Sequence, residues 1–165
     1  MELEGKKAIV TGGSIGIGAV IAKVLAREGA DVAINYRKHS DEANAVGREI
    51  EAMGRKCLVV QADVSSFDDA QKMVERVVEE LGGVDLLVCN AGVNRDAVIW
   101  KMTEEQWDQV MTINLKGYFN YVRAVVPHLR AQKSGKIVLV TSINGLRGKF
   151  GQTNYSASKG GIIAL

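Results

Sequence analysis

The sequence has one proline, two cysteines and few aromatic residues, which make up 5% of its 165 positions. Cys57 and Cys89 lie in separate apolar runs, and the chain has neither a Cys-x-x-Cys motif nor a cysteine and histidine cluster with metal-ligand spacing. We expect both cysteines to be small core residues and expect no structural metal. The only proline, Pro127, falls late in a long helical pattern, where we expect it to kink the helix.

The chain also lacks a strong net charge and a long apolar segment. Its formal charge is +2, and no basic run interleaved with aromatic residues occurs, which argues against binding to nucleic acid. No apolar segment is long enough to span a membrane, and Glu2 and Glu4 stand where a secretory leader would be basic. We expect a cytoplasmic protein. Hydrophobic residues make up 47% and charged residues 24%, a composition typical of a single globular domain over residues 1–165.

Apolar runs alternate with amphipathic stretches along the whole chain. The expected strands cover residues 6–11, 31–36, 56–61, 84–89 and 135–142. The expected helices cover residues 16–29, 40–53, 67–81 and 104–132, with a last one over 154–165. This alternation predicts an α/β fold with a doubly wound parallel sheet in a three-layer αβα arrangement. The carboxyl ends of the strands then share one edge, where such a sheet binds its ligand.

Two patterns carry the functional signal. A glycine-rich turn, Thr11 to Gly18, follows the first apolar run. Glycines there let the backbone approach a pyrophosphate, and the next helix directs unpaired N–H groups at it. Tyr155 and Lys159 stand four residues apart, so on a helix they share a face, with Ser142 thirteen residues upstream. A neighbouring cation favours the phenolate and makes a tyrosine a usable proton donor.

Further motifs lie between these patterns, with Asn90-Ala91-Gly92 ending a middle strand and Asn114 in a later helix. Their order resembles the short-chain dehydrogenase/reductase family, from the first strand to the last residue. The resemblance implies a Rossmann-type sheet, an NAD(P)-dependent oxidoreductase and a homotetramer for the full-length protein. Family members commonly continue through two further strands. We therefore expect that this chain lacks the last strands and ends inside an element.

The resemblance implies a nicotinamide cofactor. NAD specificity usually requires an acid at the end of the second strand, whereas NADP requires cationic groups. The chain has Arg37 and Lys38 there and no carboxylate before Asp41, so we expect NADPH, with NAD(H) less favoured. Ile15 departs from this pattern because many NADP-using relatives have a basic residue in its place, and solvated loop charges remain the alternative for Arg37 and Lys38. The expected cofactor-binding residues are Gly12, Ser14, Ile15, Gly16, Ile17, Gly18, Tyr36, Arg37, Lys38, Asp63, Val64, Asn90, Ala91, Gly92, Tyr155 and Lys159.

The resemblance also assigns four catalytic roles. Tyr155 would protonate the carbonyl oxygen of the substrate, and Ser142 would orient and polarise it. Lys159 would bind the nicotinamide ribose and act on the tyrosine, and Asn114 would hold a water near Lys159. Each residue taken alone also fits a bland role, such as a turn former, a helix cap or a packing residue.

Longer stretches resemble particular groups within the family. Residues 90–96 and 151–159 resemble the bacterial 3-oxoacyl-[acyl-carrier-protein] reductases, while residues 144–145 with 149–153 also resemble the acetoacetyl-CoA reductases of polyester synthesis. Both imply reduction of a 3-oxoacyl thioester, carried on acyl-carrier protein or on coenzyme A. A basic rim could steer the acidic carrier protein, although a solvated helix face explains the same residues equally well. The candidates for this rim are Arg123, Arg130, Lys133 and Lys136.

Two other functions stay open. The chain could be another alcohol or sugar dehydrogenase, because the same scaffold serves many substrates. It could also be a non-catalytic, truncated dinucleotide-binding module, since its fifth strand would be an exposed edge. His39 and His128 match no motif, and we expect both on the surface.

Overall fold

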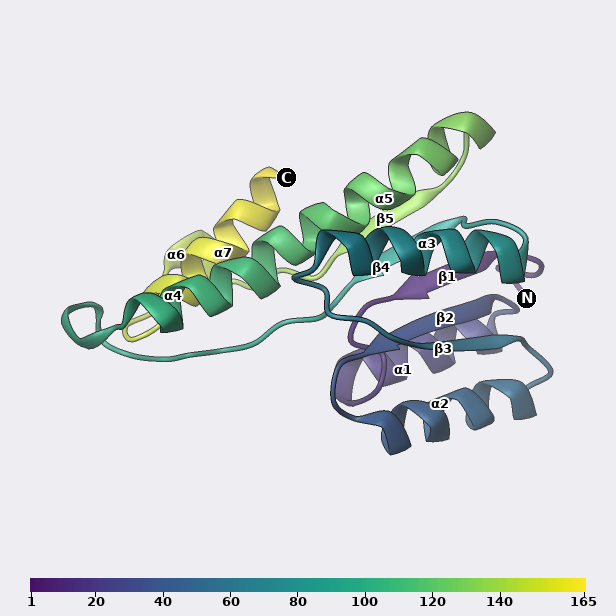
Figure 1. Cartoon of the computed structure of the whole chain (residues 1–165), viewed down its shortest axis with the longest axis horizontal. Helices are drawn as coiled ribbons and strands as arrows, with labels where there is room; N and C mark the ends of the chain where they lie inside the picture. Colours follow the sequence, from purple (N-terminus) through teal and green to yellow (C-terminus); the bar gives the residue numbers. More distant parts are fainter.

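A computed structural model describes all residues 1–165 and shows a parallel sheet between two layers of helices (Figure 1). The sheet has five strands in the order β3-β2-β1-β4-β5, so the predicted doubly wound α/β fold is confirmed. The strands are β1 (Lys7–Val10), β2 (Asp31–Tyr36), β3 (Cys57–Gln61), β4 (Leu86–Cys89) and β5 (Lys136–Leu139). The longer helices are α1 (Gly16–Arg27), α2 (Ser40–Ala52), α3 (Phe67–Leu81), α5 (Gly117–Gln132) and α7 (Thr153–Ala164).

The middle strand β1 sets the position of the ligand edge. It pairs in parallel with β2, from Lys7 opposite Asp31, and with β4, from Ala8 opposite Leu86. The chain builds outward from β1 through β2 to β3 and then crosses to the other side for β4 and β5. The direction of winding therefore reverses between β1 and β4, and their carboxyl ends flank the crevice where this class of sheet binds ligands.

Each face of the sheet buries its own apolar cluster because successive strand residues point to opposite faces. Ile9 faces a cluster of 19 buried residues that α3 and α5 cover, including Met73 and Tyr121. Ala8 and Val10 face a cluster of 12 buried residues under α1 and α2. Burial on both faces explains why the strands read as continuous apolar runs.

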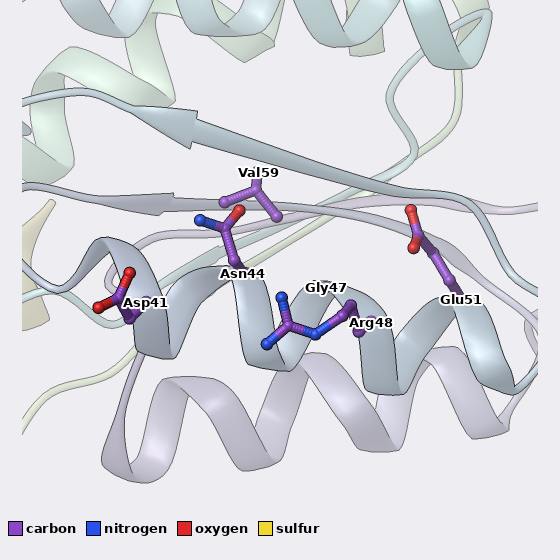
Figure 2. A pocket seen from close by; sticks show the side chains of 6 residues that line it. All are labelled: Asp41, Asn44, Gly47, Arg48, Glu51 and Val59. Carbon is purple, nitrogen blue, oxygen red and sulfur yellow. The ribbon is translucent and has the colours of Figure 1, made fainter.

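Helix α2 lies close to the edge strand β3, and Gly47 makes this approach possible. A Cβ atom at Gly47 would lie 2.8 Å from Cγ2 of Val59, which is too close for a side chain. Polar residues of α2 line a shallow hollow of about 320 Å³ along the same contact (Figure 2). The side chains of Asn44 and Glu51 rise from the helix toward the strand that carries Val59, so this hollow is a surface groove between α2 and the edge strand.

The helix predicted over residues 104–132 is three segments. It comprises α4 (Glu104–Val110), the π-helical segment η2 (Met111–Lys116) and α5, which continues past Pro127 to Gln132. The short helices η1 (Ile99–Lys101) and α6 (Asn144–Arg147) were not predicted from the sequence. The fifth strand is shorter than predicted, and it forms one edge of the sheet, with Val138 53% exposed.

The two cysteines differ in burial. Cys89 is fully buried in β4, as predicted, whereas Cys57 is only partly buried at the start of β3, the edge strand. Desolvation raises the pKa of each thiol to about 12. Among the helices, none has both the length and the hydropathy that a membrane crossing requires.

Candidate active site

The glycine-rich turn brings the first strand and helix against the fourth strand. Gly12 has φ +64°, and a Cβ atom there would lie 3.0 Å from Cα of Ala91. A Cβ atom at Gly18 would overlap the carbonyl oxygen of Gly12 and approach the Asn90 amide nitrogen to 2.5 Å. Helix α1 begins without a side-chain cap or an acidic residue in its first turn. Its first N–H groups are therefore available to an anionic ligand.

Two buried polar side chains that the sequence analysis did not assign hold this turn. The Asn35 amide accepts a hydrogen bond from Gly12 N at 2.7 Å and donates one to Ala62 O at 2.8 Å. The Thr11 hydroxyl accepts from the backbone N–H groups of Asn90 and Ala91. These bonds join the ends of β1, β2, β3 and β4 into one rigid floor. The signal available in the sequence was a polar residue, Asn35, inside an otherwise apolar strand.

A cleft of about 470 Å³ opens above this floor. Its lining comprises Gly12, Ser14, Ile15, Ile17, Asn35, Tyr36, Arg37, Lys38, His39, Ala62, Asp63, Val64, Asn90, Ala91, Gly92, Val93 and Ile113. Most of the expected cofactor residues thus meet in one hollow. Gly16 and Gly18 shape the turn outside this lining, and Tyr155 and Lys159 lie on α7. His39 is exposed, as expected, yet it also lines the cleft, which no motif indicated.

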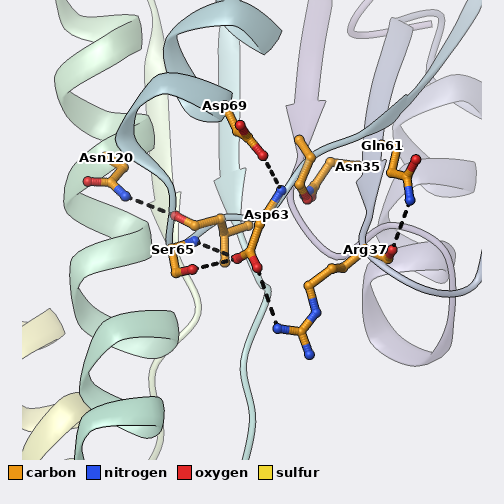
Figure 3. A network of polar contacts seen from close by, with 9 residues as sticks. Asn35, Arg37, Gln61, Asp63, Ser65, Asp69 and Asn120 are labelled. Carbon is orange, nitrogen blue, oxygen red and sulfur yellow. Dashed lines mark hydrogen bonds and ion pairs between the residues drawn. The ribbon is translucent and has the colours of Figure 1, made fainter.

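Arg37 and Asp63 form an ion pair of 3.4 Å across the cleft (Figure 3). The other oxygen of Asp63 accepts hydrogen bonds from the Ser65 backbone and hydroxyl at 2.9 and 2.7 Å. Burial alone would raise the pKa of the Asp63 carboxyl, but the Ser65 bonds and the Arg37 guanidinium outweigh it and lower the pKa below its usual value. Arg37 keeps 44% of its side chain exposed, so it can still meet a second anion.

Asn114 connects the wall of the cleft to α7. Its buried amide accepts from Val93 N at 2.8 Å and donates to Val93 O at 3.0 Å. The same amide nitrogen lies 3.3 Å from the Ser158 hydroxyl, which donates to the carbonyl oxygen of Tyr155 at 2.8 Å. The π-helical turn of η2 therefore holds the chain after β4 and the helix of Tyr155 together.

Lys159 is almost completely buried, at 3% exposure. Its ammonium donates to Val140 O at 2.7 Å and lies 5.7 Å from the centroid of the half-buried Tyr155 ring. The helical spacing of the two residues thus produces the proximity that the sequence predicted. Desolvation lowers the pKa of Lys159 to about 8, because no carboxylate pairs with the buried ammonium.

Ser142 follows β5, in a segment that packs on α7. Its hydroxyl accepts from Asn144 N at 3.2 Å, and the preceding Thr141 hydroxyl donates to Lys159 O at 2.8 Å. A Cβ atom at Gly145 would lie 2.6 Å from the carbonyl carbon of Lys159, so only glycine allows this approach. The four expected catalytic residues therefore come from η2, the end of β5 and α7, which contact one another through these bonds.

Three of the four candidate residues of the basic rim lie away from the cleft. Lys136 begins β5, and Arg130 and Lys133 lie in or just after the last turn of α5. The strands are parallel, so these residues lie at the amino-terminal edge of the sheet, opposite the cleft (Figure 1). Lys133 instead ends α5 in a left-handed conformation, with φ 56°. Separately, the structure brings no three His, Cys, Asp or Glu side chains together in a possible metal site.

The winding reversal, the glycine turn and the uncapped α1 define a Rossmann-type protein, the class of fold that binds dinucleotides at this edge. The family model for short chain dehydrogenase matches residues 6–165. The chain therefore belongs to the short chain dehydrogenase family, as its motifs predicted.

Individual relatives agree with this assignment. Over 160 residues, 97% of this chain and 66% of the relative, it is 46% identical to 3-oxoacyl-[acyl-carrier-protein] reductase FabG of Staphylococcus epidermidis. It is 41% identical over 165 residues to the protein of that name from Thermotoga maritima. A short chain dehydrogenase from Burkholderia cenocepacia, solved in complex with NADP, superposes with a TM-score of 0.94 at 39% identity, over 99% of this chain and 66% of that one. The chain thus spans about two thirds of the length of these relatives.

Proposed function

We propose that this chain belongs to an NADPH-dependent oxidoreductase that reduces a 3-oxoacyl thioester to the 3-hydroxyacyl thioester. The observation that carries the proposal is the Tyr155 ring beside the buried Lys159 ammonium, on a helix tied to the Ser142 segment and to the cleft through Asn114. The names of the Staphylococcus and Thermotoga relatives support the 3-oxoacyl substrate.

The cleft fits a phosphorylated dinucleotide. Gly12 and Gly18 let the turn pack closely on Ala91 and Asn90 beneath the cleft, and the uncapped N–H groups of α1 suit the charge of a pyrophosphate. Arg37 would bind the 2′-phosphate, with Ser14 and Lys38 as further contacts. Asp63, Val64, Asn90, Ala91 and Gly92 would line the remainder of the bound molecule. The NADP in the Burkholderia structure supports this choice over NAD(H).

The chemistry divides between cofactor and protein. NADPH, when bound, supplies a hydride for the carbonyl carbon. Negative charge then grows on the carbonyl oxygen, and the Tyr155 hydroxyl donates a proton to it while the Ser142 hydroxyl donates a hydrogen bond. The Lys159 ammonium stabilises the negative charge left on the phenol oxygen, and Asn114 would keep a water near Lys159 for proton resupply. These interactions strengthen as charge develops, so they favour the transition state.

The carrier and assembly are part of the same proposal. The substrate would be held on acyl-carrier protein or on coenzyme A, and the full-length protein would be a cytoplasmic homotetramer. A second candidate is a dinucleotide-binding module without turnover. The exposed face of β5 favours it, because Val138 is 53% exposed there.

The assay for this function is oxidation of NADPH with acetoacetyl-CoA, run on the full-length protein. We expect turnover with NADPH, at least tenfold less with NADH, and no reduction of NADP⁺ or NAD⁺ when a panel of polyols is supplied as the hydride donor instead. Turnover with polyols alone would indicate an alcohol or sugar dehydrogenase. Binding of NADPH without any turnover would indicate the non-catalytic module, and either result would overturn the proposed reaction.

Arg37→Ala tests the cofactor preference. A hydrogen bond between charged groups contributes about 1.5–3 kcal/mol, so we expect the KM for NADPH to rise about 10- to 100-fold while that for NADH changes little. The loss also leaves the Asp63 carboxylate unpaired in the cleft, where it would repel a phosphate. Arg48→Ala is the matched control, because Arg48 lies outside the cleft on α2. Equal changes for both cofactors would remove the 2′-phosphate role.

A further inference from the structure

The Lys159 ammonium lies over two phenol rings. One belongs to Tyr155, and the other to Tyr118 of α5, whose centroid is 5.1 Å from the nitrogen. The ammonium also lies 3.4 Å from the Tyr118 hydroxyl. No family motif in the sequence includes Tyr118, and the reaction described above gives it no role.

Tyr118 can act on Lys159 only as a neutral phenol. Its side chain is 1% exposed, and desolvation raises its pKa far above the usual value, so it stays protonated. Its own proton is donated to Val140 O at 3.1 Å, the carbonyl that also accepts from the ammonium at 2.7 Å. A lone pair of the Tyr118 oxygen is therefore left for the ammonium.

The ammonium therefore has two hydrogen-bond acceptors, the Val140 carbonyl and the Tyr118 hydroxyl. A buried ammonium without a carboxylate partner loses its proton easily, and each acceptor that contacts it favours the charged form. The Tyr118 ring adds attraction through its face. Only the charged ammonium can stabilise a phenolate, so the contacts that keep Lys159 charged matter for the proposed reaction.

We propose that Tyr118 is a positioning residue that keeps Lys159 protonated and beside the Tyr155 ring by accepting a hydrogen bond from its ammonium. This inference rests on the proposed role of Lys159 in reduction. The titratable groups that face the ammonium are the Cys89 thiol from β4, the Tyr155 phenol from α7 and the Tyr118 phenol itself. Burial raises the pKa of the Cys89 thiol and of the Tyr118 phenol, and no carboxylate pairs with Lys159, so the ammonium has no carboxylate to replace the Tyr118 oxygen.

Tyr118→Phe tests the proposal because it removes the oxygen and keeps the ring. The charged form loses an acceptor, so the midpoint of Lys159 titration should fall by about half a pH unit to one unit from its value of about 8. The measurement is the ¹³Cε chemical shift of labelled Lys159 against pH, with the signal assigned by Lys159→Arg. Tyr121→Phe is the matched control, since Tyr121 is a buried phenol of the same helix that bonds to Met73 Sδ.

Several outcomes decide the inference. A lowered midpoint in Tyr118→Phe and an unchanged one in Tyr121→Phe support it, and equal midpoints in all three proteins overturn it. This readout needs no turnover, so an inactive protein would refute the proposed reaction without affecting this test. If the protein is active, the alkaline limb of kcat should move to lower pH in Tyr118→Phe alone. If that variant does not fold, 3-fluorotyrosine at position 118 keeps the ring and the hydroxyl but weakens the oxygen as an acceptor, so it should lower the midpoint by a smaller amount, and an unchanged midpoint would overturn the inference.

Discussion

Tyr155→Phe is expected to lower kcat for reduction of acetoacetyl-CoA by about 10³-fold, within the range that a positioned general acid contributes. The change removes only the hydroxyl. The ring that remains still lies beside the Lys159 ammonium, so packing of α7 should be preserved. Dissociation of NADPH should change less than threefold, because its main contacts lie along the cleft. The measurement is kcat at saturating substrate, with cofactor binding followed separately by fluorescence.

Tyr36→Phe provides the control for Tyr155. Tyr36 also carries a phenol at the site, but it lines the end of the cleft near Arg37, where its hydroxyl lies 3.4 Å from the Ser40 hydroxyl. We expect kcat to stay within about threefold of the wild type. A Tyr155→Phe protein that kept more than a tenth of its kcat would show that another group donates the proton.

Lys159→Met is expected to stabilise the folded protein at pH 7 by about 3 kcal/mol while removing activity. The pKa of Lys159 falls from 10.5 to about 8 in the folded state, and each unit corresponds to about 1.4 kcal/mol. Below pH 8 the folded state holds a buried charge, which destabilises it. Between pH 8 and 10.5 the unfolded state binds more protons, so the contribution of Lys159 to stability rises with pH in that window.

The measurement is the difference in unfolding free energy between wild type and Lys159→Met at several pH values. It should shrink from about 3 kcal/mol at pH 7 to near zero above pH 10.5. Above pH 9 the raised pKa of the Cys57 thiol lowers the stability of both proteins alike, so its effect cancels. The charge of Lys159 also acts on the Cys89 thiol, so the trend due to Lys159 is measured between pH 7 and pH 9. Lys56→Met, at an exposed position, is the control and should show no such trend. A constant difference across this pH range would mean that Lys159 is not buried as a cation.

The fold was predictable where local signals mark an element at both ends. Helix α3 covers residues 67–81, as predicted, because the Ser66 hydroxyl caps its first turn and Gly82 ends it in a left-handed conformation. The prediction of a regular helix around Asn114 was wrong because the irregular turn there depends on a partner, Val93, that lies 21 residues earlier. Apolar periodicity records which face is buried and contains no information on such a distant contact.

The same distinction holds at the site. Tyr155 and Lys159 were found from a spacing of four residues, and the glycine turn from contiguous letters. Asn35 and Tyr118 could not be found in this way, since their partners lie 23 and 41 residues away. A buried polar residue indicates that a hydrogen-bond partner exists but does not identify that partner. Only the fold identifies the Asn35 contact to Gly12 and the Tyr118 contact to Lys159.

The π-helical segment η2 adjusts the phase between two helices. A π turn holds about one residue more than an α turn, so α4 and α5 follow each other with an angular offset that no regular helix would give. Removing one residue between Met111 and Lys116 would turn everything on one side of it by about 100° relative to the other. The Asn114 amide would then face away from Val93. The length of this short segment is therefore constrained more strictly than its composition, because adding or removing one residue changes the orientation of α4 relative to α5.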